Sequence, residues 1–285
     1  MKTILITGIN GFLGSSIAKR LTDKYKIVGT EYSLNNLFRI SEFDFNVYGA
    51  TQESYKSLFS ENKIDIIIHT ATFYGRGNED MSQMLAANLI SPLYLLNFAI
   101  QNSCELFINT DSALERDANI YSLTKKQFLD WLKFRSHEIK TVNMQLEHFY
   151  GPGANNTNFI TAMITQLKKN EPIINLTKGE QRRDFVYYED ILDAYELIIN
   201  SIDKLNEDFN HFEIGTGEIF SIKNLMNLLK ELTSSKSELN FGAIPLRENE
   251  LMESKPNNAN ILKLGWKPKT KIKEGLIKTI KGISG

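Results

Sequence analysis

The first fourteen residues constrain the fold of this chain more than any other segment. A short apolar run over residues 2–7 leads directly into Gly8, Gly11 and Gly14, which are spaced G-x-x-G-x-x-G. A pattern of apolar residues with helical spacing follows from Phe12. A strand that enters a helix through such a loop presents backbone amides where a phosphate group binds. The segment therefore predicts the strand–loop–helix unit of a dinucleotide-binding domain.

Each glycine of this loop has its own physical role. Gly8 permits the tight turn, Gly11 lets the backbone approach a diphosphate, and Gly14 allows the helix to pack closely on the strand. A glycine-rich turn that binds nothing is the alternative, but the position between a strand and a helix disfavours it. We assign the cofactor phosphates to six loop residues: Gly8, Asn10, Gly11, Phe12, Leu13 and Gly14.

Short apolar runs alternate with helical patterns through the first half of the chain. The runs are continuously apolar, as expected for a parallel sheet covered on both faces. The expected strands are 3–7, 26–30, 64–69, 105–109 and 141–146, and the expected helices are 12–25, 54–61, 83–101 and 122–136. This order predicts an α/β fold, a Rossmann doubly wound parallel sheet with right-handed crossovers.

The pattern changes after Gly151-Pro152-Gly153, where an Asn-rich loop and an amphipathic helix over residues 159–169 follow. We expect residues 1–150 to form the NAD(P)-binding Rossmann domain, with later segments returning to it. Residues 151–285 are expected to form mainly a smaller C-terminal α/β lobe that binds substrate. A ligand should lie at the carboxyl ends of the sheet strands.

Charge and cysteine content argue against other classes of protein. Lysine and arginine number 33 against 34 acidic residues, a net charge of −1, so no general field attracts nucleic acid or a membrane. The one cysteine, Cys104, excludes an internal disulfide and offers no metal-ligand cluster, so we expect no metal. No stretch approaches the roughly 20 apolar residues needed to span a bilayer, and we expect a cytoplasmic protein.

Glu31 ends the second expected strand, about 20 residues beyond the glycines, where an acid bonds the adenosine ribose. A carboxylate there repels a 2′-phosphate, so Glu31 favours NAD(H) over NADP(H). An ordinary solvated charge is the alternative, and Arg39 nearby would suit a 2′-phosphate. His69 and Ala71, after a buried run, are also assigned to the cofactor site. A satisfied core histidine is the alternative for His69, to which we assign no proton chemistry.

Tyr121 and Lys125 are spaced to project from one face of an expected helix. An ammonium beside a phenol lowers the pKa of the phenol, which suits Tyr121 to proton transfer with a substrate hydroxyl or carbonyl. Lys125 is also assigned to the nicotinamide ribose. The preceding strand leads to Thr110 and Ser112, and the hydroxyl of either would bond the same substrate oxygen. A strand-end turn is the alternative for this segment.

Together these residues resemble the extended short-chain dehydrogenase/reductase family, in its NAD-dependent epimerase/dehydratase branch. The resemblance covers nearly the whole chain, and the motifs occur in family order. The motifs not yet mentioned are Tyr150-Gly151-Pro152, Arg183-Asp184-Phe185-Val186, Arg247 and Leu264-Gly265-Trp266-Lys267-Pro268. The resemblance implies a nucleotide-diphosphate sugar as substrate. It also implies a homodimer formed through the helices near residues 83–101 and 122–136.

Several segments are similar to a narrower group, the CDP-paratose and CDP-abequose synthases, which reduce the 4-ketone of a CDP-linked dideoxyhexose. The resemblance implies seven substrate-binding residues: Tyr74, Arg76, His148, Asn158, Phe159, Arg183 and Arg247. The two arginines would bind the diphosphate through bidentate donors, with surface salt bridges as the alternative. Asn158 and Phe159 equally suit a helix cap and staple. Cleft packing is the alternative for Tyr74 and His148.

Three departures from the family pattern bear on the reaction. Ser112 stands where dehydratases carry a glutamate, which argues against dehydration, and Gln145 stands where an arginine is common. Glu31 fits NADH, or an NAD that is recycled within one turnover. We therefore expect an NAD(P)-dependent reductase of a 4-keto deoxysugar nucleotide, with Tyr121 as proton donor. The alternatives are an NAD-dependent nucleotide-sugar 4-epimerase and a non-catalytic dinucleotide-binding protein.

Overall fold

The computed structural model describes residues 1–75, 80–206, 208–247 and 250–283. It divides into two compact units. Unit 1 comprises Met1–Gln145 and Tyr195–Phe212, and unit 2 comprises Leu146–Ala194 and Glu213–Gly285. A segment from the second half of the sequence therefore belongs with the N-terminal part of the chain.

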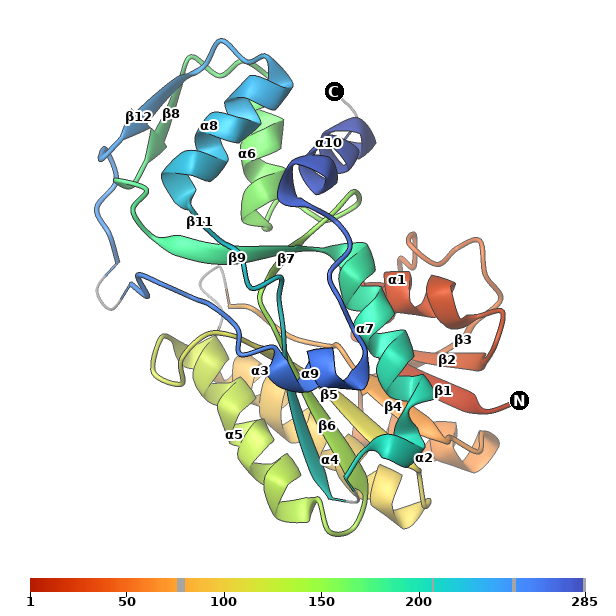
Figure 1. Cartoon of the computed structure of the whole chain (residues 1–285). Helices are drawn as coiled ribbons and strands as arrows, with labels where there is room; N and C mark the ends of the chain where they lie inside the picture. The colour runs from red at the N-terminus through yellow and green to blue at the C-terminus, as the bar shows by residue number, and fades with distance from the viewer. Residues whose placement is uncertain (76–79, 207, 248–249, 284–285) are drawn as a thin grey trace. The chain divides into compact units, whose positions relative to one another are not determined.

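Unit 1 is built on a seven-stranded sheet in the order β10-β6-β5-β4-β1-β2-β3 (Figure 1). The strands are β1 (Thr3–Thr7), β2 (Lys26–Glu31), β3 (Asn46–Gly49), β4 (Ile66–His69), β5 (Leu106–Ser112), β6 (Lys140–Leu146) and β10 (Phe209–Ile214). The pairs from β3 through β5 are all parallel. The expected doubly wound sheet is confirmed.

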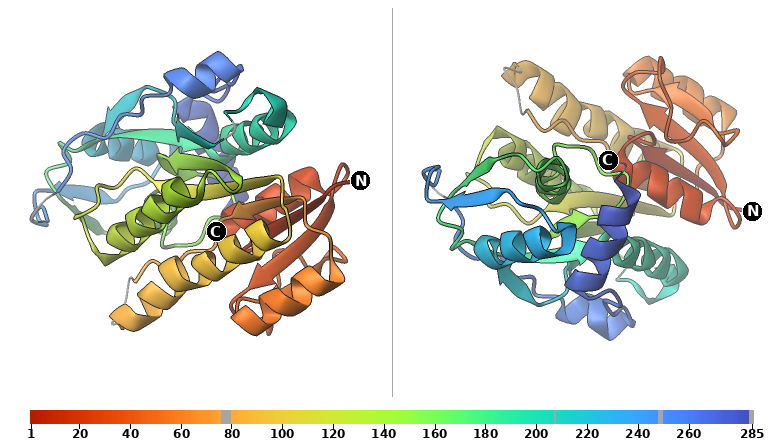
Figure 2. Two further views of the ribbon diagram at one scale, coloured as in Figure 1. Left: turned by 90° about the horizontal axis from the view of Figure 1, so that it is seen from below. Right: turned by 90° about the horizontal axis from the view of Figure 1, so that it is seen from above.

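The apolar runs are continuous because successive residues of each strand are buried on opposite faces of the sheet. Leu5, Val28, Ile67 and Phe107 belong to one buried cluster, together with side chains of three helices. These are α2 (Gln52–Glu61), α4 (Ser91–Gln101) and α5 (Ile120–Arg135), which run from orange to yellow-green in Figure 2. The intervening strand residues are equally buried, so both faces of the sheet are covered. The helix α1 (Phe12–Leu21) follows β1 and packs against it.

A continuous helix precedes β5, and its length and apolar character contradict one expectation from the sequence. It comprises α3 (Met81–Leu85), the π-helical η1 (Ala86–Ile90) and α4. The 21 residues of Met81–Gln101 are long and apolar enough to span a membrane by length and composition alone, so the expectation that no such stretch exists is wrong. In this fold the helix contacts α2 and α5 and contributes Leu95, Leu96 and Ala99 to the buried cluster, which accounts for its apolar character.

Unit 2 contains a three-stranded sheet, β11-β9-β7, and a separate parallel pair, β12-β8. The strands are β7 (His148–Tyr150), β8 (Ile173–Leu176), β9 (Arg182–Tyr187), β11 (Ile219–Ser221) and β12 (Glu238–Phe241). The helices are α6 (Phe159–Lys168), α8 (Ile222–Thr233), α9 (Ala259–Leu264) and α10 (Ile272–Gly282). The apolar faces of α6, α8 and α10 pack into one buried cluster. The helix α7 (Tyr188–Asn200), the 3-10 turn η2 (Ile202–Lys204) and β10 carry the chain between the units.

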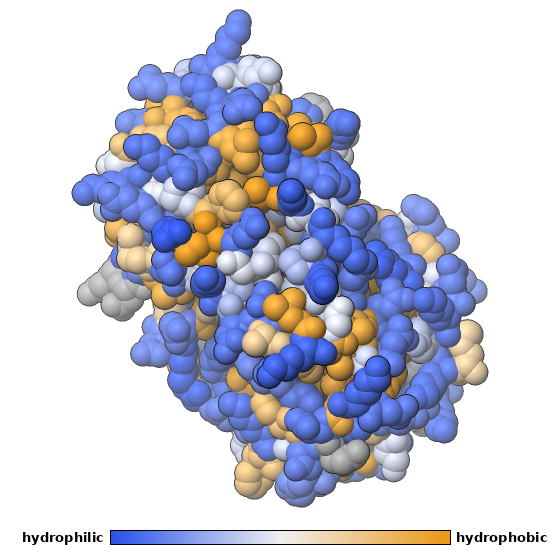
Figure 3. All heavy atoms as spheres, in the orientation of Figure 1, coloured by the Kyte–Doolittle hydropathy of each residue, from blue (hydrophilic) through white to orange (hydrophobic). Residues whose placement is uncertain are grey.

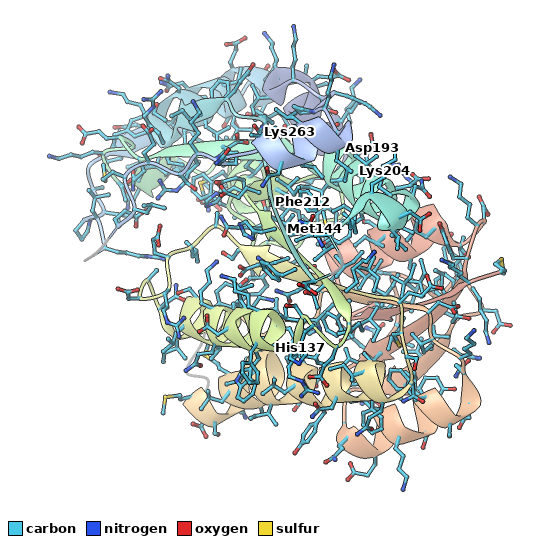
Figure 4. All side chains as sticks on the ribbon, turned by 60° about the horizontal axis from the view of Figure 1, so that its bottom comes forward. His137, Met144, Asp193, Lys204, Phe212 and Lys263 are labelled. Carbon is cyan, nitrogen blue, oxygen red and sulfur yellow. The ribbon has the colours of Figure 1, made fainter. Side chains whose placement is uncertain are left out.

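The sheet edge formed by β10 is well packed. Met144 on β6 and Phe212 on the neighbouring β10, both labelled in Figure 4, are buried. The face of the molecule drawn in Figure 3 is largely hydrophilic, with smaller hydrophobic groups between the polar side chains. This surface agrees with the high and balanced content of acidic and basic residues.

The motif at residues 264–268 has a structural role in unit 2. Gly265 ends α9 with a left-handed φ of 112°, and the Trp266 indole donates to the Asp190 carbonyl oxygen at 2.8 Å. The buried Asp190 carboxylate accepts the backbone amides of Lys269 and Thr270, each at 3.0 Å. Asp190 thus joins the first turn of α7 to the segment between α9 and α10.

We expect Asp190→Ala to lower the free energy of unfolding by about 2 kcal/mol, because it leaves two part-buried amides without their acceptor. Urea denaturation of the purified chain measures this loss. The matched control is Lys269→Ala, which keeps the backbone amide and removes only an exposed ion pair to Asp193. That change should cost no more than about 0.5 kcal/mol. Equal losses in the two variants would contradict this assignment.

Candidate active site

The glycine loop after β1 forms a cradle that side chains would fill. Gly8 has a φ of +62°, and a Cβ at Gly14 would lie 2.3 Å from the Gly8 carbonyl oxygen and 2.9 Å from Thr70 Oγ1. The helix α1 starts at Gly11 without a side-chain cap and without an acid in its first turn. The uncapped start of α1 and the close backbone packing of the loop are the features that a cofactor diphosphate needs.

Asn10 joins this loop to the segment that follows β2. Its backbone amide donates to Glu31 Oε2 at 2.9 Å, and its side chain bonds the backbone of Arg39 and Asn36. The Arg39 guanidinium lies over the Phe38 ring, 4.7 Å from its centroid. Glu31 therefore lies at the glycine loop. Arg39, which would favour NADP(H) instead, belongs to the segment that Asn10 joins to this loop.

His69 ends β4 as a buried, uncharged ring. Its Nδ1 lies 2.8 Å from Thr7 Oγ1, and its ring packs edge-on against Phe128. Burial lowers the pKa of His69 well below its ordinary value, and the charge of Lys125 lowers it further. Its Nε2 is buried without a partner among the residues that the structure describes. The Ala71 amide also bonds Thr7 Oγ1, at 3.1 Å, which holds the end of β4 beside the glycine loop.

Tyr121 and Lys125 lie in the first two turns of α5. Asn119 and Ser122 form a capping box that starts this helix. The Tyr121 ring packs against Tyr74, with centroids 5.0 Å apart, and Lys125 is 2% exposed. The structure therefore places the predicted pair in a largely buried turn beside a second tyrosine.

The pKa values of this pair differ from the sequence expectation. Burial raises the pKa of Tyr121 above its ordinary value, Tyr74 and Asp111 raise it further, and hydrogen bonds with Thr72 and Ser112 act in the opposite direction. Burial also lowers the pKa of Lys125 to about 8. The expected lowering of the Tyr121 pKa by Lys125 is therefore wrong for this structure. A phenol with a raised pKa keeps its proton at neutral pH, the form that a proton donor requires.

The two candidate hydroxyls have different partners. Thr110 Oγ1 lies 2.6 Å from the Tyr195 hydroxyl, whereas Ser112 hydrogen-bonds to the Tyr121 phenol. Ser112 Oγ accepts the Leu114 amide at 3.1 Å, so its single proton remains for the Tyr121 oxygen. This geometry favours Ser112 as the partner of Tyr121.

Sequence reasoning missed Thr72 and Asn88. Thr72 Oγ1 donates to Asn88 Oδ1 at 3.3 Å, and the contact of Thr72 with Tyr121 acts to lower the Tyr121 pKa. Asn88 is 1% exposed within the π-helical turn η1 and bonds both backbone groups of Phe73, at 2.8 and 2.9 Å. It also donates to Thr124 Oγ1 on α5. A polar residue inside an apolar helix was the available signal, and π-helical turns often mark functional sites.

Five of the predicted substrate residues belong to unit 2: His148, Asn158, Phe159, Arg183 and Arg247. Arg183 forms an ion pair with Glu250 at 2.8 Å, and the Glu250 amide donates to the carbonyl oxygen of the exposed Arg247. His148 Nδ1 lies 3.6 Å from Glu147 and packs edge-on against Phe185. Glu250 therefore contacts both predicted arginines, Arg183 through its carboxylate and Arg247 through its backbone amide.

Asn158 caps α6, which agrees with the alternative prediction that it serves as a helix cap. Its Oδ1 accepts the amides of Ile160 and Thr161, and its Nδ2 donates to the Phe149 carbonyl oxygen at 2.9 Å. Phe159 is 37% exposed. Arg76 lies outside the described residues. Within the described ranges, no three His, Cys, Asp or Glu side chains gather as a metal site.

The sheet, the open glycine loop and the buried tyrosine–lysine turn define a dinucleotide-dependent oxidoreductase of the Rossmann class. The chain belongs to the NAD dependent epimerase/dehydratase family, which its sequence matches over residues 4–215. It is 33% identical to the CDP-abequose synthase of Salmonella typhimurium over 98% of both chains. The CDP-abequose synthase of Salmonella muenchen is 30% identical over 98% of this chain and 97% of the relative.

Solved structures agree with this assignment at the level of the fold. The UDP-glucose 4-epimerase of Thermotoga maritima superimposes with a TM-score of 0.88 at 22% identity, over 98% of both chains. The Thermus thermophilus UDP-glucose 4-epimerase complex with NAD gives a TM-score of 0.85 at 19% identity, also over 98% of both chains. The chain is therefore an NAD-dependent enzyme with a sugar-nucleotide reductase, epimerase or dehydratase role.

We expect Gly14→Ala to weaken NAD binding by about tenfold or more, equal to roughly 1.4 kcal/mol of binding free energy. The added Cβ would displace the Gly8 carbonyl and distort the loop. Isothermal titration of the folded variant with NAD measures the change. Ser16→Ala, on the same helix, removes only a bond to the Phe12 carbonyl and should bind NAD as the parent does. Unchanged affinity in Gly14→Ala would contradict the proposed phosphate cradle.

Proposed function

We propose that the protein reduces the 4-keto group of a CDP-linked deoxysugar, with Tyr121 as the proton donor. The observation that carries this proposal is the buried phenol of Tyr121, which has a raised pKa and bonds two hydroxyls. The similarity to CDP-abequose synthases supports the substrate class, because the identity reaches 33% over nearly the whole of both chains.

The residues of the site suit the steps of such a reduction. The bound nicotinamide supplies the hydride when the cofactor is reduced. Ser112 orients the substrate oxygen, and Tyr121 gives that oxygen its proton. The tyrosinate left behind is stabilised by the hydroxyl of Ser112 and by the positive charge of Lys125. In this proposal Lys125 also holds the nicotinamide ribose.

The remaining substrate contacts are assigned to the residues that the family resemblance indicates. Arg183 and Arg247 are proposed to bind the diphosphate, which would take the place of the Glu250 carboxylate on Arg183. The exchange replaces one anion with another, so the buried guanidinium stays paired throughout. The other proposed contacts are Tyr74, Arg76, His148, Asn158 and Phe159.

Glu31 is proposed to select NAD(H) over NADP(H). Its carboxylate already accepts the amide of Asn10 within the glycine loop, so a 2′-phosphate brought to this position would meet a fixed negative charge. Arg39 is the residue that would oppose this preference.

We expect the parent protein to consume NADH in equal amount with a CDP-4-keto-3,6-dideoxyglucose substrate. Tyr121→Phe should lower kcat by about 10²- to 10⁴-fold, because the proton donor is lost, while NAD affinity is kept. Tyr25→Phe is a matched control, because the Tyr25 hydroxyl bonds Asn200 and neither residue is assigned to the site. Stopped-flow absorbance of the nicotinamide measures NADH consumption by the parent protein and kcat in the two variants.

Two outcomes would replace this proposal. Interconversion of a nucleotide sugar without net consumption of NADH, by protein that purifies with bound NAD, would identify a 4-epimerase. NAD binding without turnover of any keto-sugar nucleotide would identify a non-catalytic dinucleotide-binding protein. Full activity in Tyr121→Phe would remove the assigned proton donor.

A second copy of this chain is the proposed partner. The helix formed by η1 and α4 contacts α5. Both helices carry large apolar side chains that are exposed, and these are Ile90, Tyr94, Leu123, Trp131 and Phe134. Phe134 is 68% exposed and Trp131 is 45% exposed, and their rings meet edge-on. Covering such a patch with an identical helix pair would give a symmetric homodimer.

We expect Phe134→Glu to convert a homodimer into a monomer, because it places a charge at the most exposed side chain of the apolar patch. Sedimentation equilibrium measures the mass. Phe38→Glu, at another exposed phenylalanine outside the patch, should leave the mass unchanged. A parent protein that sediments as a monomer would disprove the homodimer.

A further inference from the structure

A buried ion pair lies next to the proposed catalytic turn and has no part in the reaction described above. Lys126 Nζ lies 2.8 Å from Asp111 Oδ2, and the side chains are 14% and 0% exposed. Lys126 directly follows Lys125 on α5, and Asp111 directly precedes Ser112 on β5. Charges this far from water are costly unless every donor and acceptor is matched.

The bonds of this pair converge on the backbone of Ser112. Asp111 Oδ1 accepts the Ser112 amide at 2.8 Å, and Lys126 Nζ donates to the Ser112 carbonyl oxygen at 2.8 Å. The third acceptor of the ammonium is Gln145 Oε1 on β6, at 3.4 Å. Asn143, also on β6, donates to Asp111 Oδ2 at 3.1 Å. Ser112 is therefore held on both sides by side chains from its own strand and from α5.

We propose that Lys126 and Asp111 act as positioning residues, which clamp Ser112 and keep the charge beside Tyr121 and Lys125 balanced. The inference rests on the proposed function, since it concerns the same reacting groups. Neither residue touches the substrate oxygen in this proposal. Lys126 acts through Asp111 and Ser112, and Asp111 acts through Ser112 and through its charge.

The electrostatics of the site agree with this geometry. The charge of Asp111 raises the pKa of both Tyr121 and Lys125, whereas the charge of Lys126 lowers the pKa of Lys125. The two opposite charges offset each other at the catalytic turn. The other titratable groups that face this cluster, or contact its members, are Tyr74 after β4, His69 on β4, Tyr195 on α7 and His211 on β10.

The first test measures the charge balance without turnover. Protein labelled with ¹³C at the lysine Cε is titrated by NMR, and the Lys125 signal is identified by its loss in Lys125→Met. We expect Lys126→Met to move the Lys125 pKa upward and Asp111→Asn to move it downward. The double variant should return it toward the parent value, because both charges are gone. A purely structural role would not give shifts of opposite sign.

The second test separates the clamp from the charge. We expect Lys126→Met to lower kcat by about 10- to 100-fold with little change in KM, because Ser112 is displaced. Lys126→Arg should retain most of the activity. In Lys126→Met, the further change Gln145→Arg should restore part of kcat, because residue 145 already reaches the same position from β6. The double variant D111N/K126M should remain slow although the Lys125 pKa is restored.

Several outcomes would overturn the proposal. They are an unchanged Lys125 pKa in Lys126→Met, shifts of the same sign in the two single variants, and full kcat in the double variant. If Lys126→Met does not fold, the double variant, which leaves no unpaired charge, carries both measurements. If no keto-sugar nucleotide is turned over even by the parent protein, the proposed function fails, while the lysine titration still decides the charge balance.

Discussion

The burial of one turn of α5 is the constraint on which the site depends. Removal from water keeps the proton on Tyr121 and lowers the pKa of Lys125 to about 8, so both groups are poised by the same physical cause. The charge of Asp111 partly offsets the effect of burial on Lys125, and Asp111 is itself paired with Lys126. The arrangement of the surrounding strands and helices serves to supply these partners.

The parallel sheet explains why partners so distant in sequence meet. Strands that run in the same direction deliver their carboxyl ends to one edge, which brings together Gly8 after β1, Glu31 at the end of β2, His69 at the end of β4 and Ser112 at the end of β5. The bonds from Thr7 to His69 and Ala71 join β1 and β4 at this edge. The glycine loop and Tyr121 are therefore both parts of unit 1.

The accuracy of the sequence predictions followed the strength of the local signal. Buried strands and long helices were located to within a few residues, because their apolar patterns depend only on neighbouring positions. The strand β3 was missed because Asn46–Gly49 is a short, half-exposed edge strand without an apolar run. The helix expected over 12–25 ends at Leu21, and the turn from Ala86 to Ile90 is π-helical, a distinction that hydrophobic spacing does not encode.

The sequence by itself determined the Rossmann fold, the glycine loop, the acid after β2 and the tyrosine–lysine spacing, because each is a short pattern with one physical meaning. The tertiary structure alone decided that Ser112 rather than Thr110 faces Tyr121, that Thr72 and Asn88 join the site, and that Lys126 pairs with Asp111. Burial and hydrogen-bond partners depend on contacts between distant segments. The predicted direction of the Tyr121 pKa shift was wrong for that reason, since burial raises this pKa and the charge of Asp111 raises it further.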